Sequence, residues 1–284
     1  MKKTFAIAAL LTLAAPVFAQ TPAYTPPKND KVPSADPYVA DALKESPRHG
    51  EWADVKMAGG TMLKAWVVYP ARRDKAGVVI VIHENRGIND WTRAVGDQVA
   101  EDGFIAIVPD LLSGKGPNGG GTESLGAQVG QAIGSLTPAD RAARLDALMA
   151  FGKTMPSSNG KTGVMGFCWG GGSTLLYAIA QPALGAAVMY YGPPPSVPGS
   201  QTPDLSGLTS VKAPILAMYG GADARVTASV EPITAEMKRL GKSYEPHIFD
   251  GAAHGFMHQR SEADYKAAEQ SWPLVVAFFA KNLK

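Results

Sequence analysis

The sharpest chemical feature of the sequence is a cysteine held between glycines. Cys168, the only cysteine, stands in Gly166-Phe167-Cys168-Trp169-Gly170, after an apolar run and before a helical pattern. This is the spacing of a nucleophile elbow with cysteine in place of serine, where glycines two residues away avoid a collision with the turn. The following helix directs its first N–H groups at the sulfur, which would favour the thiolate. The alternative is a buried cysteine that only fills space.

A nucleophile of this kind needs a base, and three histidines follow Cys168. His254 lies in a loop of small residues directly after the last predicted strand, and it is the preferred base. His258, four residues further on, is the weaker choice. His247 falls within the alternation of the strand itself, which indicates a structural role.

The base in turn needs an acid that orients it. Asp223 directly follows the strand predicted over residues 214–219, whereas Asp204 sits in a Pro-rich loop and Asp250 is too close in sequence to His254 to reach its ring easily. We therefore predict a triad in the order nucleophile, acid, histidine, which is typical of α/β-hydrolases. An ordinary exposed turn aspartate is the alternative for Asp223.

A further carboxylate, Glu84, stands at the end of the first buried parallel strand. The loop after this strand supplies one oxyanion donor in α/β-hydrolases, and the residue after the nucleophile supplies the other. The backbone N–H groups of Asn85 and Trp169 are therefore the predicted oxyanion hole. Glu84 would lie near the thiol, with an exposed loop glutamate as the alternative.

The elements that must position these residues alternate between strands and helices. Residues 51–57 and 62–69 alternate apolar with polar side chains, which predicts a β-hairpin. Further strands are predicted at residues 77–83, 104–108, 162–167, 186–191, 214–219 and 244–249, and helices at 91–102, 138–153, 170–180, 226–240 and 261–283. This order predicts an α/β fold with a mostly parallel central sheet and helices on both faces.

Composition limits the classes of partner. The 284 residues are 45% hydrophobic and 18% charged, with a net charge of +2, which suits one α/β domain with a full core. The sequence has no basic cluster of the kind that would indicate a nucleic-acid partner. It also has no apolar stretch long enough to span a bilayer. We expect a small-molecule substrate and no metal site. The oligomeric state stays open, with a monomer favoured.

The N-terminus differs from the rest of the chain. Lys2 and Lys3 precede an apolar run and then small residues, which predicts a signal peptide over residues 1–19, cleaved after Ala19. The protein would then be periplasmic or secreted, and a single cysteine can form no internal disulfide. Residues 20–48 are polar and Pro-rich, which favours an extended arm or linker and not a packed element. The catalytic domain is predicted over residues 49–284.

From about Trp66 to Phe279 the chain resembles the dienelactone hydrolase (carboxymethylenebutenolidase) family. The resemblance rests on Glu84 with Gly87 and Asn89, Pro109-Asp110-Leu111, residues 158–161 (SNGK), Gly166 to Gly171, Tyr190-Tyr191-Gly192, Gly220 to Asp223, and Ala253 to Phe256. It implies an α/β-hydrolase fold, a triad of Cys168, Asp223 and His254, and a Glu84 that contacts the thiol and helps to generate the thiolate when substrate binds. It also implies hydrolysis of dienelactone to maleylacetate without a cofactor.

Two departures limit what the resemblance carries over. The family's prototype binds the carboxylate of its substrate with two arginines, but here one position holds His258 and the other falls on or near Gly126. Arg260, Arg86 or Arg225 could substitute, and we take His258, Arg260 and Arg86 as the candidate substrate contacts. Losing a bidentate clamp weakens the binding of an anionic lactone. The prototype is also cytoplasmic, so we expect retained chemistry on a changed or broadened substrate.

Three hypotheses follow for the function. The leading one is a hydrolase that cleaves an ester or lactone through an acyl-enzyme on Cys168. The second is a non-catalytic exported binding protein with the same fold. The third is a thioesterase or peptidase. Loss of turnover on Cys168→Ala separates the first from the second.

Overall fold

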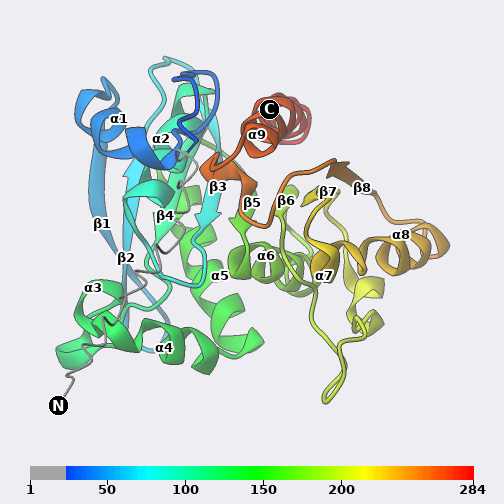
Figure 1. Cartoon of the computed structure of the whole chain (residues 1–284). Coiled ribbons are helices and arrows are strands. Elements are labelled where there is room, and N and C mark those ends of the chain that lie inside the picture. The colour runs from blue at the N-terminus through cyan, green and yellow to red at the C-terminus, as the bar shows by residue number, and fades with distance from the viewer. Residues whose placement is uncertain (1–23) are drawn as a thin grey trace, which may run out of the picture.

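A computed structural model describes residues 24–284, and the predicted signal peptide lies outside this range. Within it, eight strands form one sheet in the order β1-β2-β4-β3-β5-β6-β7-β8 (Figure 1). The two junctions that involve β2 are antiparallel and all others are parallel. The strands are β1 Gly50–Lys56, β2 Met62–Val68, β3 Ala76–Ile82, β4 Ile105–Pro109, β5 Ser158–Phe167, β6 Ala186–Tyr190, β7 Ile215–Gly220 and β8 Tyr244–Phe249. The predicted mostly parallel sheet is confirmed.

The strands form where the sequence is continuously apolar or alternates. Every residue of β3, β4, β6 and β7 is buried, as expected for parallel strands covered on both faces. The outer hairpin of β1 and β2 carries exposed and buried residues in near alternation. Because β3, β5, β6 and β7 run in parallel, their carboxyl ends meet at one edge of the sheet.

Helices cover both faces, as predicted. One face carries α1, α2 and α9, and the other carries α5, α6 and α8 (Figure 1). The helices of the described residues are α1 Val39–Glu45, α2 Asp90–Glu101, α3 Thr122–Leu125, α4 Val129–Ser135, α5 Pro138–Thr154, α6 Trp169–Ala180, α7 Ala224–Thr227, α8 Val230–Arg239 and α9 Glu262–Leu283. None of the helices in residues 24–284 is both long and apolar enough to cross a membrane.

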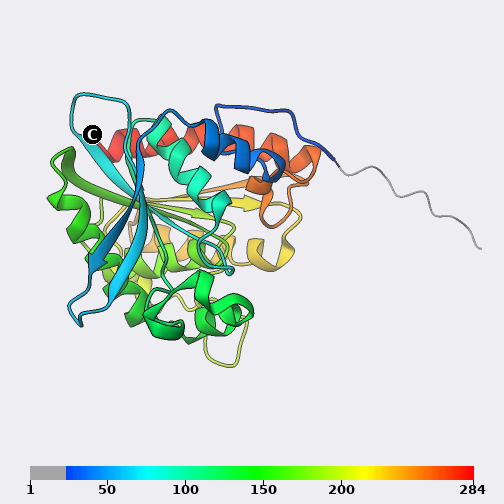
Figure 2. The ribbon, with the colours of Figure 1, turned by 90° about the vertical axis from the view of Figure 1, so that its left-hand side faces the viewer.

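Residues 24–48 were predicted to form an extended arm or linker and not a packed element, and this prediction is wrong for this N-terminal segment. It contains a short 3-10 helix at Asp36–Tyr38 and the helix α1, and it buries Val32 and Val39 against the face that carries α2 and α9 (Figure 2). The Ser46 hydroxyl and Arg48 both bond Asp97 of α2, at 2.6 and 2.5 Å. Composition suggested a linker, but a few apolar side chains and specific polar contacts are enough to fix the segment to the domain.

Candidate active site

Cys168 occupies a sharp turn between β5 and α6. Its backbone has φ 54° and ψ −116°, a conformation that non-glycine residues rarely adopt. Its N–H donates to the carbonyl of Tyr190 at 3.0 Å, which ties the turn to the end of β6. A Cβ on Gly170 would lie 2.5 Å from the carbonyl oxygen of His83, and one on Gly166 would meet the carbonyl of Gly170. The two flanking glycines are therefore required by space, as the sequence predicted.

His254 and Asp223 meet at the same edge of the sheet. Asp223 follows β7, His254 lies in the loop after β8, and His254 Nδ1 is 2.5 Å from Asp223 Oδ2. The carboxylate is 8% exposed and the imidazole 34%, so the acid is shielded while the ring faces an accessible space. Gly220 allows this contact, because a Cβ there would lie 2.5 Å from the carbonyl oxygen of Ala252 in the loop that carries His254.

The residues that competed for these roles lie elsewhere. Asp204 is half-buried and accepts hydrogen bonds from Ser206, and Asp250 is exposed. His247 bonds the neighbouring Glu245 at 2.9 Å on the outer strand β8. The structure therefore brings together Asp223 and His254 and leaves these alternatives apart from them.

Tyr191 connects the dyad to the cysteine turn, and the sequence analysis quoted it only within a motif of the family resemblance, with no role assigned. It follows Tyr190, whose carbonyl holds Cys168, and its ring lies edge-on to His254 with centroids 5.1 Å apart. Tyr191 is fully buried with φ 36°, and its hydroxyl has no hydrogen-bond partner. Among the described residues no hydrogen bond joins Cys168 Sγ to His254, and Tyr191 is the residue that contacts both the ring of His254 and the end of β6 that holds the cysteine turn.

The electrostatics at Cys168 correct one expectation. Burial and the negative charge of Glu84 raise the pKa of the Cys168 thiol above its ordinary value, while the N–H of Trp169 and the charge of Arg225 oppose this only partly. The helix end therefore does act on the sulfur, as predicted. However, desolvation and a nearby carboxylate outweigh it, and the resting site favours the thiol over the thiolate.

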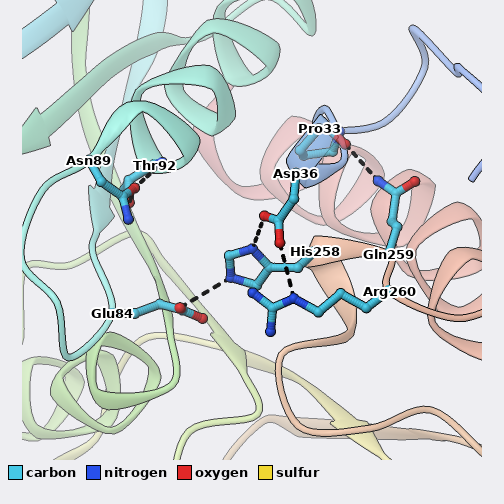
Figure 3. Close-up of polar contacts among 8 residues, drawn as sticks. All are labelled: Pro33, Asp36, Glu84, Asn89, Thr92, His258, Gln259 and Arg260. Carbon is cyan, nitrogen blue, oxygen red and sulfur yellow. Dashed lines mark hydrogen bonds and ion pairs between the residues drawn. The ribbon is translucent and has the colours of Figure 1, made fainter. Parts of the chain in front are cut away.

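Glu84 lies beside the thiol but bonds a different residue. Its Oε2 is 3.1 Å from Nε2 of His258, whose Nδ1 is 2.5 Å from Oδ1 of Asp36 (Figure 3). The His258 side chain is buried and each of its ring nitrogens bonds a carboxylate, so neither nitrogen is free for a substrate contact. Arg260 bonds the other oxygen of Asp36 at 3.0 Å. Of the predicted substrate contacts, Arg86 is exposed, and nothing in the structure directs it to the thiol.

The predicted oxyanion donors lie on either side of the cysteine turn. Trp169 is the first residue of α6, so its N–H has no partner within the helix and points to the sulfur. The N–H of Asn85, in the exposed loop after β3, has no hydrogen-bond partner within residues 24–284. The N–H of Asn85 is therefore free to donate to a ligand oxygen, and that of Trp169 faces the sulfur from the start of α6.

His83, a second residue without a sequence signal, fixes this region. It is fully buried, its Nδ1 lies 2.7 Å from the carbonyl oxygen of Glu84, and its ring stacks on Trp169 with centroids 5.5 Å apart. Arg141 covers the same indole at 4.7 Å. Burial lowers the pKa of His83, so the ring is neutral and joins the loop after β3 to the start of α6, which carry the two predicted oxyanion donors.

Two cavities open near this edge of the sheet. The larger, of about 1030 Å³, lies between the β1–β2 hairpin, the start of α2 and the loop after β4, and no triad residue lines it. The smaller, of about 320 Å³, includes Arg225 and the loop of residues 193–203. Among residues 24–284, no group of three or more His, Cys, Asp or Glu side chains could hold a metal ion.

Comparison with known families decides the relationship. Residues 63–283 match the model of the dienelactone hydrolase family. The chain belongs to the dienelactone hydrolase family. Over 224 residues it is 28% identical to a Methylorubrum extorquens protein named "Putative carboxymethylenebutenolidase", a match that covers 77% of this chain and 76% of that protein.

Two solved structures show the fold shared by this dienelactone hydrolase family member. A dienelactone hydrolase from Anabaena variabilis superposes with a TM-score of 0.64 and 23% identity, covering 84% of this chain and 99% of that one. An acylaminoacyl peptidase from Pyrococcus horikoshii superposes with a TM-score of 0.66 and 18% identity, covering 88% of this chain and 44% of that one. The fold is the α/β-hydrolase fold.

Proposed function

We propose that the protein is a thiol-dependent hydrolase that cleaves a small ester or lactone. The observation that carries the proposal is the strained Cys168 turn at the same sheet edge as the His254–Asp223 pair, with the N–H of Trp169 directed at the sulfur and a free N–H on Asn85 in the loop after β3. Membership of the dienelactone hydrolase family supports the same chemistry.

The proposed reaction has two steps. Cys168 Sγ passes its proton to His254 and attacks the acyl carbon, and His254 then donates that proton to the departing alkoxide, so that a thioester forms and the C–O bond breaks. Water, deprotonated by His254, then attacks the thioester and releases the acid and the free thiol. The N–H groups of Asn85 and Trp169 would bind the oxyanion in both steps. Asp223 keeps the ring of His254 in the required orientation.

The proposal is tested by removing the Cys168 thiol and measuring ester hydrolysis. In Cys168→Ala, hydrolysis of activated small esters should fall to the uncatalysed rate, and prolonged treatment with iodoacetamide at alkaline pH should abolish it in the wild-type protein. Mass spectrometry of the wild-type protein quenched during turnover should show the acyl group on Cys168. Undiminished turnover in Cys168→Ala would exclude the proposal, and no acyl adduct across esters, lactones, thioesters and peptides would favour a binding protein.

We further propose a neutral substrate. Asp36 already bonds both His258 and Arg260, so two of the three predicted substrate contacts are paired within the chain itself. A substrate carboxylate would find no paired cations there and would face the charge of Glu84. Neutral esters should therefore be cleaved with higher kcat/KM than anionic esters of the same leaving group, and the reverse preference would contradict the proposal.

Export to the periplasm or beyond is part of the proposal, on the strength of residues 1–19. The mature chain should begin at Gln20, which keeps the whole N-terminal segment that packs on the domain. Sequencing of the N-terminus after cell fractionation tests this. A full-length chain in the cytoplasm would exclude it.

A further inference from the structure

The N-terminal segment reaches the proposed site through a single carboxylate. Asp36 bonds His258, and His258 bonds Glu84, so three side chains from distant parts of the sequence form one continuous row (Figure 3). The family match begins at residue 63, so Asp36 and its segment lie outside the matched region. The row therefore adds a component to the site that the matched region does not contain.

The protonation of His258 follows from its partners. A neutral imidazole has one N–H donor and one acceptor nitrogen, whereas an ionised carboxylate only accepts. Asp36 faces Nδ1 at 2.5 Å and Glu84 faces Nε2 at 3.1 Å, so both ring nitrogens must donate and the ring must be an imidazolium. The indole of Trp91 stacks on the ring with centroids 4.1 Å apart, an arrangement that favours a cation.

The imidazolium depends on Asp36. The His258 side chain is only 8% exposed, so water does little to stabilise its charge. With Asp36 removed, one nitrogen would lose its acceptor and a single carboxylate would remain to compensate for burial. A neutral ring could then turn its lone pair toward Glu84, which would release that carboxylate.

Glu84 connects this row to the thiol. Its charge acts directly on Cys168, and its side chain is 17% exposed, so few water molecules fix its position. Its carboxylate bonds Nε2 of His258, and the buried hydroxyl of Tyr191 also interacts with it. Because His258 is the charged partner of the two, we take it to set the position of the carboxylate.

We propose that Asp36 is a positioning residue for the thiol site: it keeps His258 doubly protonated, and His258 then holds Glu84 in place beside Cys168. The inference rests on the proposed function and adds to it a role for the N-terminal segment. The segment is well fixed for this task, because the carbonyl of Pro33 accepts from the buried Gln259 side chain at 2.8 Å, next to His258.

A double-mutant cycle tests the row. Asp36→Asn should lower kcat/KM by about tenfold, mainly through kcat because Asp36 does not touch the substrate, and Glu84→Gln should lower it further. If Asp36 acts through Glu84, the double variant should be no worse than Glu84→Gln alone. Multiplied effects of the two substitutions, or an unchanged kcat/KM in Asp36→Asn, would overturn the proposal.

Two further variants separate this role from mere attachment of the segment. Ser46→Ala removes the bond to Asp97 but leaves Asp36 on His258, so its kcat/KM should stay unchanged. Asp36→Glu keeps the carboxylate and should recover most of the activity that Asp36→Asn loses. Equal losses in all three variants would indicate a structural role and reject the proposal. Full turnover in Cys168→Ala would instead reject the proposed function.

Discussion

At the scale of single residues, Cys168 combines a strained backbone with a protected thiol. The turn gives it φ 54°, and its surroundings disfavour the charge that nucleophilic attack requires. A resting thiol with few thiolate molecules is poorly reactive toward oxidants and alkylating agents. If substrate binding redirects Glu84 or brings the sulfur to His254, the nucleophile forms only when an acyl group is present.

Alkylation by iodoacetamide should report this protection. Because burial and Glu84 raise the pKa of the Cys168 thiol, the rate should be slow at pH 7 and rise with a midpoint above 9.0, the ordinary value. Glu84→Gln removes the second of these causes and should shift the midpoint to lower pH. Intact-mass spectrometry from pH 6 to 10 measures the rate, with Cys168→Ala as the unlabelled control.

Glu84→Gln should be more reactive than the wild-type protein toward iodoacetamide and less active toward esters. This opposition follows because the Glu84 charge suppresses the resting thiolate, while the Glu84 carboxylate is expected to assist once substrate is bound. A midpoint at or below 9.0 in the wild-type protein would contradict the protected thiol. Parallel changes in alkylation and turnover would contradict the role given to Glu84.

The sequence made some of these residues visible and hid others. Cys168, Asp223 and His254 each stand directly after a predicted strand, so their type and place in the α/β order pointed to one sheet edge. Asp36 carries no such sign, because its partner His258 is 222 residues away and the intervening fold alone brings the two together. Tyr191 likewise acts through its strand end and its burial, which composition does not reveal.

At the scale of elements, the first turn of α9 holds the loop that carries His254. Asp264 is buried, its Oδ1 accepts from the N–H of Ala253 at 2.8 Å, and its own N–H donates to the cap residue Ser261. His254 is thus positioned by a helix that begins eight residues later. The closing helix therefore does more than cover the sheet.

Asp264→Ala should therefore weaken both the fold and the site. The N–H of Ala253 would be left without a partner, which should lower the free energy of unfolding by about 1–3 kcal/mol. The kcat/KM should also fall, because the loop no longer holds His254 toward Asp223. Urea unfolding and ester hydrolysis measure the two effects. Glu262→Gln, which loses only the exposed pair with Lys266 on the same turn, is the control and should change neither.

The elements themselves were largely predictable, while their order in the sheet was not. Continuous apolar runs marked β3 and β4, and the helix predicted over residues 138–153 is confirmed as α5, which Thr137 caps together with Asp140. The position of β4 between β2 and β3 depends on side-chain packing across strands, to which a single strand's pattern gives no clue. α1 was missed because its seven residues lie in a Pro-rich stretch.

At the scale of the whole molecule, the N-terminal segment is joined to the domain by groups that titrate. Burial acts to lower the pKa of His258, but its bonds to Asp36 and Glu84 outweigh burial and raise it. Burial acts to raise the pKa of Asp36, but its bonds to His258 and Arg260 outweigh burial and lower it. The stability that this attachment gives should therefore decline both at high pH, where His258 loses its proton, and at low pH, where Asp36 gains one.

The signs define a window. The raised pKa of His258 stabilises the folded state fully below about 6.5, its unfolded value, and this contribution is lost as the pH rises through the folded value. The lowered pKa of Asp36 stabilises the folded state above about 3.9, and this contribution is lost as the pH falls through the folded value. The difference in free energy of unfolding between the wild-type protein and Asp36→Asn should thus be largest between about pH 4 and 6.5.

Urea unfolding of both proteins at pH 5, 6, 7, 8 and 9 measures that difference. The difference should shrink steadily above pH 7, because His258 of the wild-type protein then loses its proton and with it the ion pair with Asp36. Asp36→Asn has no such ion pair to lose. Ser46→Ala removes a neutral hydroxyl from the same segment, so its cost should not decline in this way. A difference for Asp36→Asn that stays constant or grows toward pH 9 would mean that the segment is not held by an imidazolium, and the row from Asp36 to Glu84 would lose its physical basis.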